Sequence, residues 1–114
     1  MSDTPKLKVY LSAPMSGHLN LNRPMLAEIT KALREKGYTV FNPGELGIDD
    51  WVQAMKLCVK ALPDYDYLIQ LPGWEGSRGA TVEYALATIL GLDVITLKWA
   101  SEHLGLPQSL IAGN

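Results

Sequence analysis

One segment of the 114-residue chain organises the rest: Leu71-Pro72-Gly73-Trp74-Glu75-Gly76-Ser77-Arg78-Gly79-Ala80-Thr81-Val82-Glu83. An apolar run at 67–71, short enough to be a buried strand, leads into it, and apolar residues recur at helical spacing over 80–90. A glycine-rich turn between a strand and a helix directs free backbone N–H groups and the positive end of the helix dipole at a ligand. Ser77 is placed to cap that helix, and Arg78 adds a mobile positive charge. The segment therefore predicts an anion-binding site.

Glu83 stands in an otherwise apolar stripe of the expected helix. Ala80, Ala87 and Leu90 share its face, at offsets of −3, +4 and +7 residues. One interpretation is a buried carboxyl group whose pKa is raised unless a partner holds its charged form. The other is a side chain at the edge of the stripe that reaches water, because buried glutamates are rare. The anion-binding turn lies within one or two helical turns of Glu83 and favours the first interpretation.

Composition narrows the class of protein. The chain is 47% hydrophobic and 19% charged, which is typical of one soluble globular domain, expected over 1–114. Its net charge of −2 argues against DNA or RNA as a partner. A single cysteine and two distant histidines give no metal-ligand spacing, so we expect no metal and no cofactor. With no apolar run near 18 residues and a polar start, we expect a cytoplasmic protein that does not bind a membrane.

Strand and helix signals alternate along the chain. We expect the first helix to be capped by Asn20 or Asn22 and ended by Gly37, and the second to be capped by Asp49 or Asp50. The expected strands are 7–13, 38–41, 67–71 and 92–97, and a short last helix is expected at 99–104.

This alternation predicts an α/β fold with a parallel sheet covered on both faces. Ligands bind such sheets beyond the carboxyl ends of the strands, where the strand order switches. In the order 2-1-3-4, the first and third strands are neighbours at the switch. The loops at 13–17 and 73–79 should then face each other across the ligand.

Several segments resemble the nucleoside 2-deoxyribosyltransferase superfamily: 10–17, reading YLSAPMSG, 40–43, reading VFNP, and 71–80, reading LPGWEGSRGA, together with Glu83. Within it, the chain is most similar to a family of short domains with a Gly-Trp-Glu-x-Ser-Arg-Gly-Ala segment. The likeness runs from about Lys8 to Leu97. It implies a flavodoxin-like or Rossmann-like three-layer sandwich with four or five strands, ordered 2-1-3-4(-5), and chemistry at an N-glycosidic bond. It also implies a homo-oligomer.

The resemblance further implies site residues. Glu83 falls where the superfamily has its nucleophilic glutamate. Tyr10 matches the tyrosine that touches it and is the remaining candidate for a catalytic proton donor to the leaving base. At the position of Ser77, members of the superfamily that act on nucleosides tend to have aspartate, whereas members that act on nucleoside 5′-monophosphates are similar to this chain in having serine. A serine that serves only as the N-cap of the helix is compatible with either substrate. Trp74 either stacks on a nucleobase or packs over the helix behind it. The residues expected to bind the nucleotide are Ser12, Ala13, Pro14, Met15, Ser16, Gly17, Gly73, Trp74, Ser77, Arg78 and Gly79.

Cys58 is a departure from the superfamily pattern. Related sequences usually carry an aspartate eight residues before the one at Asp66, and here that position is Cys58. A thiol on an apolar helix face is more simply a core residue than a nucleophile, since no cation is placed to activate it. Two functions therefore stay open: a nucleotide N-glycosidase or deoxyribosyltransferase, and a protein that holds a nucleotide without cleaving it. A third reading, a structural module without a ligand, leaves the glycine turn unexplained.

Overall fold

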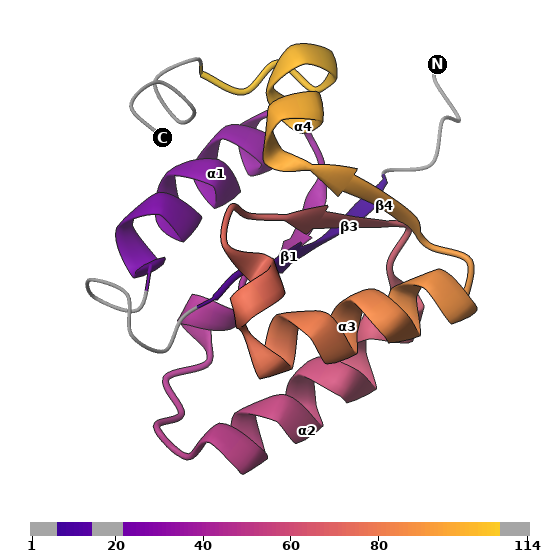
Figure 1. Cartoon of the computed structure of the whole chain (residues 1–114). Helices are drawn as coiled ribbons and strands as arrows, with labels where there is room; N and C mark the ends of the chain where they lie inside the picture. Colours follow the sequence, from indigo (N-terminus) through magenta and orange to yellow (C-terminus); the bar gives the residue numbers. More distant parts are fainter. Residues whose placement is uncertain (1–6, 15–21, 108–114) are drawn as a thin grey trace.

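A computed structural model describes residues 7–14 and 22–107. Four parallel strands form one sheet, in the order β2-β1-β3-β4 (Figure 1). The predicted strand order is confirmed, and no fifth strand occurs among the described residues. The strands are β1 (Lys8–Ser12), β2 (Thr39–Phe41), β3 (Tyr67–Gln70) and β4 (Asp93–Thr96).

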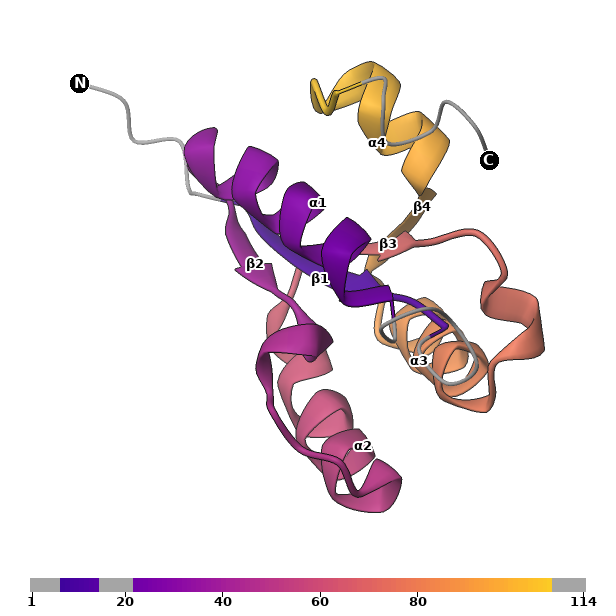
Figure 2. The ribbon, with the colours of Figure 1, turned by 90° about the vertical axis from the view of Figure 1, so that its left-hand side faces the viewer.

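Helices cover both faces of the sheet and complete the predicted three layers. Figures 1 and 2 show α1 and α4 on one face and α2 and α3 on the other. Within the described residues, no helix is long and apolar enough to cross a membrane. The α-helices are α1 (Arg23–Glu35), α2 (Trp51–Ala61), α3 (Arg78–Ile89) and α4 (Leu97–His103), and the 3-10 turns are η2 (Pro43–Glu45), η3 (Leu62–Asp64) and η4 (Trp74–Gly76).

Strand register divides the side chains of the sheet between two cores. Val9 and Leu11 of β1 belong to the core beneath α1 and α4, whereas Tyr10 belongs to the core beneath α2 and α3. Ser12 follows on the Tyr10 face, because side chains alternate along a strand. The register pairs Ser12 with Gln70 at the carboxyl end of β3. This pair of polar residues therefore ends the α2/α3 face.

The helix caps explain where the helices begin. Asp50 caps α2 by accepting a hydrogen bond from the Gln53 N–H at 3.0 Å, and Ser77 caps α3 by accepting from the Ala80 N–H at 3.2 Å. Asn22 occupies the N-cap position of α1, but it does not cap with its side chain. Its backbone is left-handed, at φ 61°, and its Nδ2 donates to the carbonyl of Pro14 instead. Asn22 thereby ties the start of α1 to the residues that directly follow β1.

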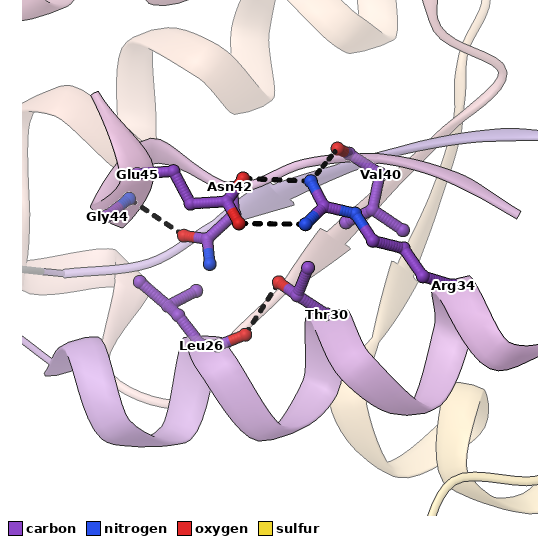
Figure 3. A network of polar contacts seen from close by, with 7 residues as sticks. All are labelled: Leu26, Thr30, Arg34, Val40, Asn42, Gly44 and Glu45. Atoms are coloured by element: carbon purple, nitrogen blue, oxygen red, sulfur yellow. Dashed lines mark hydrogen bonds and ion pairs between the residues drawn. The ribbon is translucent and has the colours of Figure 1, made fainter.

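A polar network fixes the segment that follows β2 (Figure 3). The guanidinium group of Arg34 on α1 donates to the carbonyl oxygen of Val40 at 3.1 Å and to both carboxylate oxygens of Glu45 at 2.8 Å. Oδ1 of Asn42 accepts from the N–H of Gly44 at 2.7 Å, which closes the turn into η2. These bonds anchor the chain just before it runs along the site described next.

Candidate functional site

Glu83 is buried on α3, facing β1, and only 5% of its surface is exposed. Its Oε1 accepts a hydrogen bond from Oγ of Ser12 at 2.7 Å, and its Oε2 accepts from the hydroxyl group of Tyr10. Of the two interpretations of the helical stripe, the buried one is therefore correct. Alternation along β1 brings both hydroxyl groups to the same carboxyl group.

The surroundings of Glu83 set its protonation. Burial raises the pKa of the Glu83 carboxyl group, and hydrogen bonds from Tyr10 and Ser12 only partly offset that rise. Burial and the nearby Glu83 carboxylate raise the pKa of Tyr10 far above its ordinary value. Tyr10 thus keeps its proton at any physiological pH and stays a hydrogen-bond donor to Glu83.

Cys58 of α2 belongs to the same cluster. It is 4% exposed and packs with Tyr10 and Ala87 in the core beneath α2 and α3. Burial raises the pKa of the Cys58 thiol to about 11, so the group is neutral at physiological pH. A neutral thiol is a poor nucleophile, which agrees with its interpretation as a core residue. Cys58 nevertheless borders the cavity that Glu83 borders.

The first cavity lies between α2, α3 and the segment after β2, and it has a volume of about 190 Å³. Glu83 and Cys58 border it at one side, and Ala13 borders it from the end of β1. Small-molecule sites in proteins commonly measure about 300–1,000 Å³. The first cavity is therefore smaller than most small-molecule sites and can enclose a part of such a molecule.

One arginine and the start of α3 border this cavity. Ser77 and Arg23 line it, and the first intrahelical bond of α3 runs from the Thr81 N–H to the Ser77 carbonyl at 3.0 Å. Of the N–H groups before Thr81, that of Ala80 donates to the Ser77 cap, and those of Arg78 and Gly79 have no partner within the helix. Arg78 does not line the cavity, but its guanidinium carbon lies 4.6 Å from the ring centroid of Trp51, which does.

Gly79 permits the close approach of α2 and α3 beside the cavity. A Cβ atom at this position would lie 3.1 Å from Sδ of Met55 and 3.8 Å from Nε1 of Trp51. The contact with Met55 is tight enough that its side chain would have to move by a few tenths of an ångström, whereas the contact with Trp51 is ordinary van der Waals contact. The third glycine of the turn therefore serves helix packing at the edge of the site.

The structure separates the predicted site residues into groups. Trp74 and Gly73 border a different cavity, and the Trp74 ring packs on Tyr84 with 5.0 Å between centroids. Packing over the helix behind it, the second of the two roles considered for Trp74, is thus the one observed. Pro14 is buried, and its carbonyl oxygen binds Asn22. Glu83, Tyr10, Ser12, Ala13, Ser77 and Gly79 surround the first cavity or contact its glutamate, whereas Met15, Ser16 and Gly17 lie outside the described residues.

Sequence reasoning missed one wall of the cavity. Residues 46–49 line it together with Pro43, Trp51 and Met55. The available signal was the Asn42-Pro43 stop after β2, because β2 ends at the same sheet edge as β1. Asp49 is the important omission, since it adds a second carboxylate to the cavity wall. Among the residues described, no group of three or more His, Cys, Asp or Glu side chains could hold a metal ion.

A family assignment can be made on the sequence that builds this site. Residues 7–96, from β1 through β4, match the family model of a domain of unknown function (DUF4406). The chain belongs to this family. The matched range contains every described residue named above as bordering the first cavity. No curated protein matches the sequence.

A solved structure gives an independent comparison. The chain is similar to the 2-deoxyribosyltransferase of the psychrotolerant bacterium Bacillus psychrosaccharolyticus, with a TM-score of 0.59 and 23% identity. The likeness covers 78% of this chain and 70% of the other. At this identity it establishes the shared α/β fold, and the chemistry must be argued from the residues of the present site.

Proposed function

We propose that this protein binds a nucleoside 5′-monophosphate in the first cavity and cleaves its N-glycosidic bond. The observation that carries the proposal is a buried carboxyl group, Glu83, that borders a cavity and is held by two hydroxyl donors. A buried carboxyl group is costly to maintain, and such groups cluster at sites of function. The fold shared with a 2-deoxyribosyltransferase supports the choice of an N-glycosidic bond.

Glu83 would act as the nucleophile. A carboxylate oxygen attacks the anomeric carbon, an ester bond forms, and the C–N bond breaks as the base leaves with a proton from water or a nearby acid. Water then hydrolyses the ester, or a second base displaces it. Tyr10 and Ser12 act as positioning residues in this scheme, because both hold the carboxylate and neither borders the cavity.

The phosphate group would lie at the N-terminus of α3. The Ser77 hydroxyl accepts a bond from the Ala80 N–H, which leaves its own proton free for a phosphate oxygen. Arg23 lines the same cavity, and Arg78 can leave the Trp51 ring to pair with an anion. Asp49, the other carboxylate on the wall, would accept a hydrogen bond from a sugar hydroxyl group.

One observation favours a second candidate function, in which the protein holds the nucleotide intact. Cys58 borders the cavity beside Glu83, and its neutral thiol cannot orient a hydroxyl group as a carboxylate does. The phosphate contacts would be unaffected. A nucleotide-sequestering protein would therefore keep the same cavity and lose only turnover.

The deciding experiment follows free base by chromatography after incubation of the protein with a panel of nucleoside 5′-monophosphates. Base release by the wild type and its loss by at least about 10³-fold in Glu83→Gln would support the glycosidase. The exposed Glu102→Gln on α4 is the matched control and should keep the wild-type rate. Nucleotide recovered intact and stoichiometric from the denatured protein would support sequestration. Base release by Glu83→Gln at the wild-type rate would remove Glu83 as the nucleophile.

The phosphate contact has a separate test by calorimetry. Monophosphates should bind at least about tenfold more tightly than the same nucleosides, since charge-assisted hydrogen bonds contribute about 1.5–3 kcal/mol each. Arg23→Gln should reduce this preference more than Lys31→Gln, a change on the exposed side of α1. Equal affinities for nucleosides and monophosphates would contradict the anion site.

A further inference from the structure

A second cavity, of about 580 Å³, opens beyond the carboxyl ends of β3 and β4. It is bordered by the turn from Leu71 to Glu75 and by the start of α4, and it shares no lining residue with the first cavity. Figure 2 shows that the chain leads away from the end of β3 in this turn before it reaches α3. The volume lies within the range of about 300–1,000 Å³ that is common for small-molecule sites.

Gln70 at the end of β3 lines this cavity and is 8% exposed. Its Nε2 has no hydrogen-bond partner within the described part of the chain. Its neighbours in register, Ser12 and Thr96, make other hydrogen bonds: Ser12 donates to Glu83, and the Thr96 hydroxyl oxygen accepts from the Trp99 N–H. A buried amide without a partner is costly, so Gln70 is an unfilled donor at the wall of a cavity.

The other polar groups at the second cavity define what would fit. Lys98 and Glu75 both line it and are exposed, and they form no ion pair with each other. One positive and one negative charge give no net preference for a charged ligand. Trp74 also lines the cavity and supplies an aromatic surface on which a flat ring can pack.

We propose that the second cavity is a binding site for an uncharged planar heterocycle, such as a free nucleobase, recognised by Gln70 and Trp74. The edge of a nucleobase carries a donor beside an acceptor, which matches the two atoms of a glutamine amide group. Base rings also stack on tryptophan. This site goes beyond the proposed function, since the second cavity shares no lining residue with the first.

The test is a ¹H–¹⁵N NMR titration of the full chain with adenine, and with cytosine in parallel. The expected result is a saturable shift of the Gln70 side-chain amide and Trp74 indole signals, each assigned by its loss in Gln70→Leu or Trp74→Phe. Gln70→Leu should weaken binding by roughly tenfold or more, which is the scale of one paired amide–base contact. Gln53→Leu, at an exposed glutamine of α2, is the matched control and should bind as the wild type does.

Three outcomes would overturn the proposal. The first is the absence of saturable shifts at Gln70 and Trp74 up to the solubility limit of both bases. The second is an equal affinity for the base in Gln70→Leu and the wild type. The third is a loss of base binding in Glu83→Gln. The last would place the base in the first cavity instead. Because the two cavities share no lining residue, failure here leaves the glycosidase test above unaffected, and the converse also holds.

Discussion

The two faces of the sheet differ although the same strands build both. Beneath α1 and α4, β1 and β3 present Val9, Leu11 and Ile69, which are fully buried in an apolar core. Beneath α2 and α3, the same strands end in Ser12 and Gln70. Side-chain alternation thus gives the sheet two different faces, separated by the thickness of one strand. The face beneath α1 and α4 is the packing face, and the face beneath α2 and α3, which ends in Ser12 and Gln70, is the chemical face. Mutations should therefore be able to damage either property without the other.

The largest stability loss is expected on the packing face. Ile29 of α1 is fully buried, and Ile29→Ala should reduce the free energy of unfolding by about 2–5 kcal/mol, since it removes apolar contacts and leaves a cavity. Urea unfolding measures the loss. Nucleotide affinity of the folded fraction should be unchanged. A decrease in the free energy of unfolding below about 1 kcal/mol, or a loss of nucleotide binding without a loss of stability, would contradict the difference between the two faces.

Cys58→Asp tests the chemical face from the position where the superfamily resemblance places an aspartate. The new carboxyl group would enter the core with Tyr10 and Ala87, and we expect a stability loss of roughly 1–3 kcal/mol if it is unpaired. Nucleotide affinity should not improve, whereas the rate of base release should rise. Cys58→Ser is the control without a carboxylate. A variant that is more stable than the wild type, with unchanged base release, would contradict this account of Cys58.

The ionisation of Glu83 predicts a dependence of stability on pH. The pKa of Glu83 in the folded protein lies above its ordinary value of 4.5. At any pH between 4.5 and the pKa in the folded protein, the folded chain therefore keeps a proton that the unfolded chain has lost. Stability must then fall as pH rises through that interval, by about 1.4 kcal/mol for each unit between the two pKa values. The rate of base release should rise over the same interval, because the nucleophile is the ionised form.

Urea midpoints measured from pH 4.5 to 8 check the stability half of this prediction. Glu83→Gln lacks the titration, so wild-type stability should decline relative to the variant as pH rises. Parallel curves for the two proteins would mean that Glu83 titrates normally in the fold.

The smallest effect is expected at the polar network beside β2. Arg34 and Glu45 form a hydrogen-bonded ion pair, but their side chains are 46% and 49% exposed. Exposed pairs contribute about 0–1 kcal/mol, so Glu45→Gln should cost no more than that in urea unfolding. A larger loss would show that the wall of the first cavity depends on this pair.

Much of the fold could be predicted from local sequence. Alternating strand and helix signals predicted the parallel sheet, and the superfamily resemblance implied its strand order. The Ser77 cap and the start of α3 followed from hydrogen-bonding chemistry at helix ends. The contact between Tyr10 and Glu83, 73 residues apart, was implied by the superfamily resemblance and is present. These features depend on short-range patterns or on segments that the resemblance already covers.

The rest of the site depends on packing that no local pattern encodes. Trp74 was expected either to stack on a nucleobase or to pack over the helix behind it, and only the structure shows that its ring lies against Tyr84 and borders the second cavity. Asp49 reaches the first cavity only because the segment after β2 forms a wall of it opposite residues of α2 and α3. Gln70 lies inside an apolar run, so the sequence predicts an ordinary strand residue. Only the structure shows that its Nε2 is buried without a hydrogen-bond partner.

The measurement that tests the central claim most directly is the mass of the intact protein, quenched in acid during incubation with a nucleoside 5′-monophosphate. The account predicts an added mass equal to one sugar phosphate less one water, located to the peptide that contains Glu83 and absent from Glu83→Gln. An adduct located on any other residue, or free base formed by Glu83→Gln at the wild-type rate, would contradict it.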